Sequence, residues 1–139
     1  MPRLFRASPL NAIWEGSGNV IALDILRAIE RSPEALEAVR VEIGSARGEN
    51  THYDDHCDRL DRWLAPGALS QSNARAFAEE MGLALQAVSL RMMSPDSVFE
   101  GFCETRLNSE NRAFSYGAAT SKVDPQPIID RARPLSSIS

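Results

Sequence analysis

The chain has 139 residues, of which 43% are hydrophobic and 24% are charged, and it carries a formal net charge of −4. This length suits one domain with a modest core, no apolar run approaches the roughly 20 residues of a membrane span, and no signal peptide is readable at the start. Only two cysteines are present, Cys57 and Cys103, which favours reduced thiols in a cytoplasmic protein over a disulfide framework.

The charge is distributed unevenly along the chain. Residues 1–32 carry a net +1, residues 33–104 a net −7 and residues 105–139 a net +2. Fourteen of the fifteen basic residues are arginine, whose planar side chain suits bidentate contacts with phosphate or carboxylate, although genome composition would give the same bias. A nucleic-acid partner would therefore require the acids of the middle segment to face away from the basic residues.

The hydrophobic pattern predicts helices almost throughout the chain. Apolar residues recur at three- and four-residue steps, and Ser-Pro or Asp-Pro pairs mark helix starts. In chain order, the predicted helices run over about 19–31, from 33 to Gly44 or Gly48, from Asn50 or Thr51 to Pro66, over about 70–93, from Ser94-Pro95 to about Leu107, and over a short stretch opened by Asp124-Pro125. No strand alternation is visible, so the sequence predicts an all-α fold, a helical bundle.

The longest predicted helix carries an apolar stripe made of Phe77, Met81, Leu85, Val88 and Met92. Methionine and phenylalanine side chains in such a stripe could line a ligand-binding surface. Helical spacing with polar residues between them favours core packing instead. We therefore expect a core that includes Phe77, Met81, Met92, Met93, Phe99 and Phe102.

The stretch Trp14-Glu15-Gly16-Ser17-Gly18-Asn19 places one carboxylate on a glycine-flanked turn directly before the first predicted helix. Glycines permit a close backbone approach to a ligand, and the following helix start leaves amide donors near the turn. Packed against an indole in a dry pocket, a glutamate would have a raised pKa suited to proton abstraction. The alternative is a helix entry loop with a solvated glutamate.

The segment from Pro2 to Arg27, centred on this stretch, resembles the acyl-CoA dehydrogenase family, and more narrowly its AidB branch, which is linked to the adaptive response to DNA alkylation. Later stretches are similar to the end of AidB-type proteins: Val98 to Leu107, Ala113-Phe114 and Ile128 to Pro134. The resemblance spans the whole chain, strongly at the start and more loosely in the middle.

The resemblance implies an FAD-dependent oxidoreductase site. Glu15 matches the catalytic base that removes the α-proton of an acyl-CoA, and Gly16, Ser17 and Asn19 match positions that contact the flavin. N-capping is the alternative role for Ser17 and Asn19. Trp14 replaces the tyrosine common in the wider family, which implies a reshaped acyl pocket.

The resemblance also implies two parts within this chain. Residues 1–32 would form the catalytic-base turn and the last helix of the dehydrogenase bundle, and residues 33–139 the AidB-type C-terminal helical domain. The flavin-binding portion of the family has no counterpart here, so we expect a C-terminal portion of a homo-oligomeric protein. The alternatives are a helical DNA- or protein-binding module without redox activity and a decayed fragment.

Arginines are the candidates for contact with double-stranded DNA. Arg27 matches a basic surface position of AidB-type proteins. Arg106 and Arg112, with Lys122, Arg131 and Arg133, are further candidates because phosphate contacts supply most non-specific affinity. The alternative for Arg27 is an ion pair with Asp24 or Glu30 on its own helix.

One cluster resembles a set of metal ligands: His52, Asp54, Asp55, His56 and Cys57. The two histidines are four residues apart, so on a helix they share a face. Cys57 does not share that face well, and two ligands do not close a tetrahedral shell. We expect no metal site here.

Overall fold

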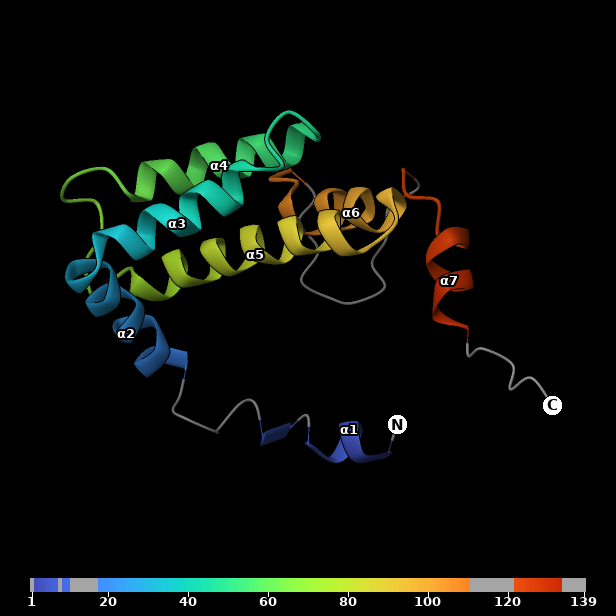
Figure 1. The fold of residues 1–139 in the computed structure, drawn as a ribbon, viewed down its shortest axis with the longest axis horizontal. Helices are drawn as coiled ribbons and strands as arrows, with labels where there is room; N and C mark the ends of the chain where they lie inside the picture. Colours follow the sequence, from blue (N-terminus) through green and yellow to red (C-terminus); the bar gives the residue numbers. More distant parts are fainter. Residues whose placement is uncertain (1, 8, 11–17, 111–121, 134–139) are drawn as a thin grey trace.

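The fold is described from a computed structural model, which describes residues 2–7, 9–10, 18–110 and 122–133. All of the regular structure in these ranges is helical (Figure 1), as the hydrophobic pattern predicts. The helices are α1 (Pro2–Ala7), α2 (Gly18–Arg31), α3 (Pro33–Gly44), α4 (Thr51–Trp63), α5 (Ala74–Met93), α6 (Asp96–Phe102), the π-helical turn η2 (Cys103–Leu107) and α7 (Gln126–Ala132). None of them is long and apolar enough to span a membrane.

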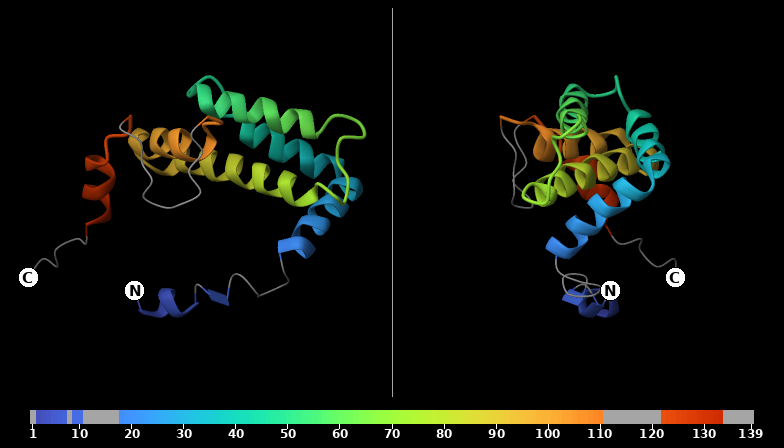
Figure 2. Two further views of the ribbon diagram at one scale, coloured as in Figure 1. Left: turned by 180° about the vertical axis from the view of Figure 1, so that it is seen from behind. Right: turned by 90° about the vertical axis from the view of Figure 1, so that its left-hand side faces the viewer.

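The longest helix, α5, organises the bundle (Figures 1 and 2). Helix α2 packs across its first turns, α3 and α4 lie along it, and α6 with η2 covers its second half. Helix α7 contacts α6 and stands apart from the α3–α4 side. The bundle therefore joins α2 to the remaining helices chiefly through α5.

The core lies between α4, α5, α6 and η2. Its largest fully buried side chains include Tyr53 and Phe77, and the Tyr53 ring meets Phe99 edge to face, with centroids 5.9 Å apart. Helix α4 is amphipathic, which places Tyr53, Cys57 and Leu60 on its buried face. The core prediction is confirmed for Phe77 and Phe99, and Met81 and Phe102 pack half-buried against it.

Two methionines contradict the predicted core. Met92 and Met93 are 69% and 80% exposed, and neither joins the core cluster, whose last residue on α5 is Val88. The apolar stripe therefore ends one turn earlier than its sequence spacing indicates.

Several helix boundaries depend on side-chain hydrogen bonds. Asn50 caps α4 by accepting from the backbone N–H groups of His52 and Tyr53 at 2.9 and 3.2 Å. Asn73 instead holds a turn, accepting from the Ser70 N–H at 2.8 Å and donating to the Ala68 carbonyl at 2.8 Å. Helix α5 therefore starts at Ala74 and not near Ser70 as predicted.

The helix predicted after Pro95 changes its winding along its length. It is α-helical to Phe102, and then the Asn108 N–H reaches the Cys103 carbonyl at 3.0 Å, which closes one π-helical turn. Single π-helical turns are frequent at functional sites. This turn contains Glu104, which is buried and contacts His52 of α4.

Candidate functional site

The predicted catalytic turn directly precedes α2 in the sequence. Glu15, Gly16 and Ser17 fall outside the described residues, so their roles stay predictions. Gly18 is the first residue of α2, and Asn19 follows it. The described part of this candidate site is therefore the start of α2.

The side chain of Asn19 contacts a residue from a distant part of the chain. Arg75, the second residue of α5, donates from Nη1 to the Asn19 Oδ1 at 2.9 Å. Its guanidinium also lies over Gly18, where an added Cβ would come within 3.8 Å of the guanidinium carbon. Arg75 thus joins the start of α2 to the start of α5.

This helix start is rich in hydrogen-bond donors. The first backbone N–H groups of an α-helix have no partner within the helix, and its dipole makes this end positive. The Asn19 amide and the Arg75 guanidinium add side-chain donors at the same place. Such a set of donors suits a ligand that is rich in hydrogen-bond acceptors.

The arginines predicted to contact DNA have different surroundings. Arg27 Nη1 lies 2.5 Å from the Asp24 Oδ1, as the alternative interpretation of this residue holds, and both side chains are exposed. Arg106 belongs to η2 and is half-buried, and Arg112 lies outside the described residues. Arg131 and Arg133 are exposed on or just after α7, where Arg133 pairs with Asp130 at 3.4 Å.

The two histidines of the metal-like cluster have separate partners. His52 Nε2 lies 3.0 Å from the Glu104 Oε2, and His56 is fully buried against Glu80 of α5. His56 Nε2 faces the Glu80 backbone carbonyl at 2.8 Å, and its Nδ1 faces the Glu80 carboxylate at 3.2 Å and Arg59 at 3.0 Å. Within the described ranges, no three potential ligands gather for a metal ion.

Glu104 lies at the centre of a polar pocket between the start of α4, α6 and residues 122–124. Burial works against its charge, but Lys122 at 3.5 Å, His52 and Asn108 together lower the pKa of Glu104. Both carboxylate oxygens are already bonded within the protein. The arrangement therefore ties η2, α4 and the C-terminal segment together and does not offer a free base.

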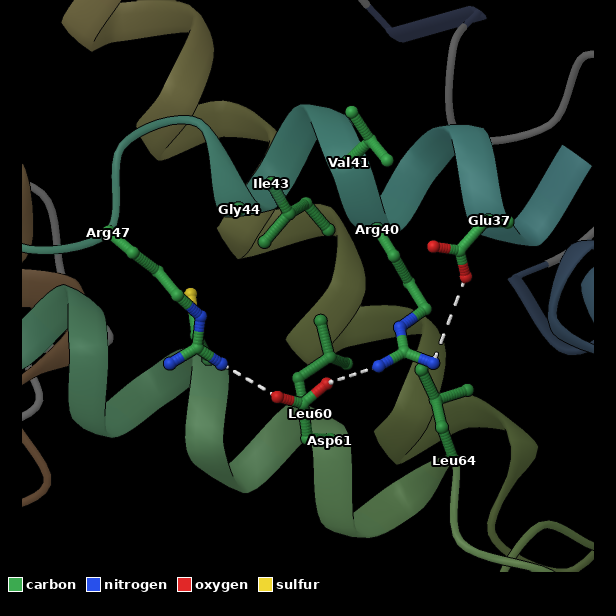
Figure 3. Close-up of a pocket in the computed structure, with 10 residues that line it drawn as sticks. Glu37, Arg40, Val41, Ile43, Gly44, Arg47, Leu60, Asp61 and Leu64 are labelled. Carbon is green, nitrogen blue, oxygen red and sulfur yellow. Dashed lines mark hydrogen bonds and ion pairs between the residues drawn. The ribbon is translucent and has the colours of Figure 1, made fainter.

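A second cleft, of about 170 Å³, lies between α3 and α4 and contains two arginines (Figure 3). Arg47 contacts Asp58 and Asp61 at 2.7 Å each, and Arg40 lies 3.6 Å from Asp61 and 3.9 Å from Glu37. Each guanidinium thus faces carboxylates of its own chain. The ion pairs in this cleft connect two helices and do not form a site for an anion.

Burial makes both cysteine thiols poor nucleophiles. Cys57 and Cys103 are free cysteines, in agreement with the expected reduced thiols, and both are buried. Burial raises the pKa of Cys57, and burial together with the nearby Cys57 raises the pKa of Cys103 to about 12. Neither sulfur is a nucleophile at neutral pH.

Sequence reasoning did not find Arg75, Glu104 or Glu80. Arg75 is 56 residues from Asn19, and Glu104 is 52 residues from His52. No local spacing connects such pairs, because only the packing of α4 and α5 against their neighbours brings them together. The sequence shows that arginines and carboxylates are present, but it does not show which of them form pairs.

Comparison with known proteins gives one informative similarity. No protein-family model matches the chain, and no solved structure matches it. The chain is 29% identical over 118 residues to the Escherichia coli (strain K12) protein named "Putative acyl-CoA dehydrogenase AidB", covering 78% of this chain and 20% of that protein. This similarity supports a distant relationship to acyl-CoA dehydrogenase-like proteins. The chain spans about a fifth of the length of that relative.

Proposed function

We propose that this chain is the C-terminal portion of an FAD-dependent, acyl-CoA dehydrogenase-like protein of the AidB branch. The observation that carries the proposal is the similarity over 118 residues to a protein named as a putative acyl-CoA dehydrogenase. The donor-rich start of α2, at the position expected to contact flavin, adds support.

The proposed reaction is α,β-dehydrogenation of an acyl-CoA thioester. Bound FAD would supply the hydride acceptor. The Glu15 carboxylate takes the α-proton, because the thioester carbonyl stabilises the carbanion that develops and a carboxylate in a dry site has a raised proton affinity. Gly16, Ser17 and Asn19, which follow the base within four residues of the sequence, would hold the cofactor.

The test is made on the natural protein, captured from its source cell with an antibody to the C-terminal helices. Its intact mass shows whether the 15.3 kDa chain continues into a longer flavoprotein, and released FAD is identified by mass spectrometry. Reduction of the bound flavin by acyl-CoA then reports the chemistry. We expect Glu15→Gln to slow this reduction by roughly 10²–10⁴-fold, and the exposed control Glu34→Gln to leave it unchanged. A 15.3 kDa species without flavin would overturn the proposal.

Double-stranded DNA is the partner expected in the alternative function, a binding module without redox activity. In the described residues, the ion pair of Arg27 with Asp24 and the half-buried position of Arg106 speak against that alternative. A fluorescence titration with a DNA duplex tests it, because binding through phosphates falls steeply with salt. We expect no salt-sensitive binding of the duplex.

A further inference from the structure

An apolar groove lies between the second half of α5, the end of α6 and α7. Its volume is about 560 Å³, and its walls include Leu85, Leu90, Met93 and Phe102. Leu85 and Phe102 also pack against the core, which holds this part of the groove in place, whereas Met93 is 80% exposed. The groove therefore combines a fixed apolar surface with one apolar side chain that is open to solvent.

Helix α5 contributes one continuous face to the groove. Leu85, Ser89 and Met93 follow one another at four-residue steps, which places them on the same side of the helix. The Ser89 hydroxyl donates to the Leu85 carbonyl at 2.8 Å, so its hydrogen is not offered to the groove. A methionine side chain is unbranched and adapts to irregular apolar surfaces. For Met93, which is not in the core, the groove thus favours the alternative interpretation of the sequence, a ligand-binding surface.

Among the described residues that line the groove, only Arg131 of α7 is charged. Helix α7 lies against α6 through Ile128, whose Cδ1 would be 3.3 Å from a Cβ added at Gly101. Arg131 follows Ile128 by three residues and therefore lies on the same side of α7. Within the described ranges Arg131 forms no ion pair, and the carboxylate of the neighbouring Asp130 pairs with Arg133 at 3.4 Å. The described part of the groove thus has one cation whose charge is not balanced by a paired carboxylate.

The dimensions of the groove favour a small ligand over a protein partner. Small-molecule sites have volumes of roughly 300–1,000 Å³ and are mostly apolar with a few polar groups. A specific protein interface takes about 20–30 residues on each side, whereas eight described residues line this groove. An alkyl chain would cover the apolar walls, and an anionic head group would pair with the guanidinium.

We propose that this groove binds a single-chain carboxylate, whose alkyl chain lies against Leu90, Met93 and Phe102 and whose head group pairs with Arg131. Burial of the chain supplies most of the affinity, and Arg131 selects the sign of the head group. This inference does not rest on the proposed function, because no described residue of the groove belongs to the stretch around Glu15.

Titration of the 139-residue chain with decanoate, below the concentration at which decanoate forms micelles, tests the site. Isotope-labelled methionine methyl groups, observed by NMR, report where the ligand binds. The Met93 signal should shift until it saturates, and the signal of Met92, which does not line the groove, should shift less. Octanoate should bind roughly tenfold more weakly, because it buries two fewer methylene groups. Decyltrimethylammonium, which has the same chain and the opposite charge, should bind at least about fivefold more weakly than decanoate.

Two pairs of variants separate the head group from the chain. Arg131→Gln should raise the dissociation constant for decanoate roughly fivefold, the effect of one exposed ion pair, and should abolish the preference over decyltrimethylammonium. The matched control Arg133→Gln, two residues further on, should leave both affinities unchanged. Met93→Gln should weaken both ligands by a similar factor because it removes an apolar contact, whereas Met92→Gln should not. All four side chains are exposed, so circular dichroism should show the same helix content in every variant.

Each other outcome contradicts a defined part of the proposal. If decanoate does not bind saturably, or shifts Met92 and Met93 equally, the groove is not the site. Equal affinities for decanoate and decyltrimethylammonium, or no effect of Arg131→Gln, would overturn the choice of an anionic ligand. Sedimentation that shows a dimer of the wild-type chain, dissociated by Met93→Gln, would mean that a second copy covers the groove, and this would overturn the proposal as a whole.

Discussion

The hydroxyl of Tyr53 donates a hydrogen bond to a carbonyl group in the last turn of helix α3, and its removal should lower the stability of the protein. Helix α3 stops at Gly44, so its last carbonyl groups have no partner within the helix. The Ile43 carbonyl accepts from the Tyr53 hydroxyl at 2.6 Å, and the Tyr53 side chain is fully buried. Tyr53→Phe removes this donor and keeps the ring that packs against Phe99.

The size of the effect follows from the burial of the group left behind. A buried carbonyl without a hydrogen bond costs about 1–3 kcal/mol. We therefore expect Tyr53→Phe to lower the free energy of unfolding by that amount. In a domain of this size the midpoint of thermal unfolding falls by roughly 3 °C per kcal/mol.

Urea unfolding followed by circular dichroism measures this loss, with Ser89→Ala as the matched control. The Ser89 hydroxyl also donates to a backbone carbonyl, that of Leu85 at 2.8 Å, but on an exposed helix face. The Leu85 carbonyl keeps its helical partner there, so the control should change stability by less than about 0.5 kcal/mol. If both variants unfold at the same urea concentration as the wild type, the hydrogen bond from Tyr53 to Ile43 does not stabilise the protein.

Three further predictions follow from single residues. Gly82→Ala should stabilise the protein by about 0.5–1 kcal/mol, since no heavy atom lies within 4 Å of the added Cβ. Gly101→Ala should stabilise it less, because the added Cβ would lie 3.2 Å from the Val123 side chain. Equal gains of the two variants in thermal melts would contradict this. The pKa of Glu104 is lowered in the folded state, so its stabilising effect is present above the ordinary value of 4.5 and is lost as the pH falls below it. Glu104→Gln should therefore lose less stability on acidification than the wild type, and parallel pH profiles would show otherwise. With a pKa of about 12, Cys103 should react with a disulfide reagent at pH 8 only after unfolding, and rapid labelling of the folded protein would disprove its burial.

The helix pattern could be read from the sequence because it depends on local chemistry. The Asn50 cap and the proline at position 33 mark helix starts through contacts within a few residues. The start of α5 was misplaced because Asn73 bonds to Ser70 and Ala68 in a turn, and a serine-rich stretch is compatible with both arrangements. The π-helical turn left no trace in the hydrophobic spacing either.

The candidate site was only partly accessible to sequence reasoning. The motif and its resemblance pointed to the start of α2, where the described residues of the motif are Gly18 and Asn19. The partner of Asn19 could not be found in this way, because its identity depends on where α5 crosses α2. Likewise, spacing predicted that Met92 continues the apolar stripe, yet exposure depends on whether another helix reaches that far.

The dependence of α2 on α5 has a consequence for the order in which the chain folds during synthesis. Helix α2 contacts α3 and, more extensively, α5, from which 42 residues separate it along the chain. A ribosome that adds roughly 5–20 residues per second needs about 2–8 s to make that stretch. Through this interval Ile25 and Ile29, which pack against the finished core, lack most of their partners. During synthesis, the apolar face of α2 therefore stays largely uncovered until α5 has been made.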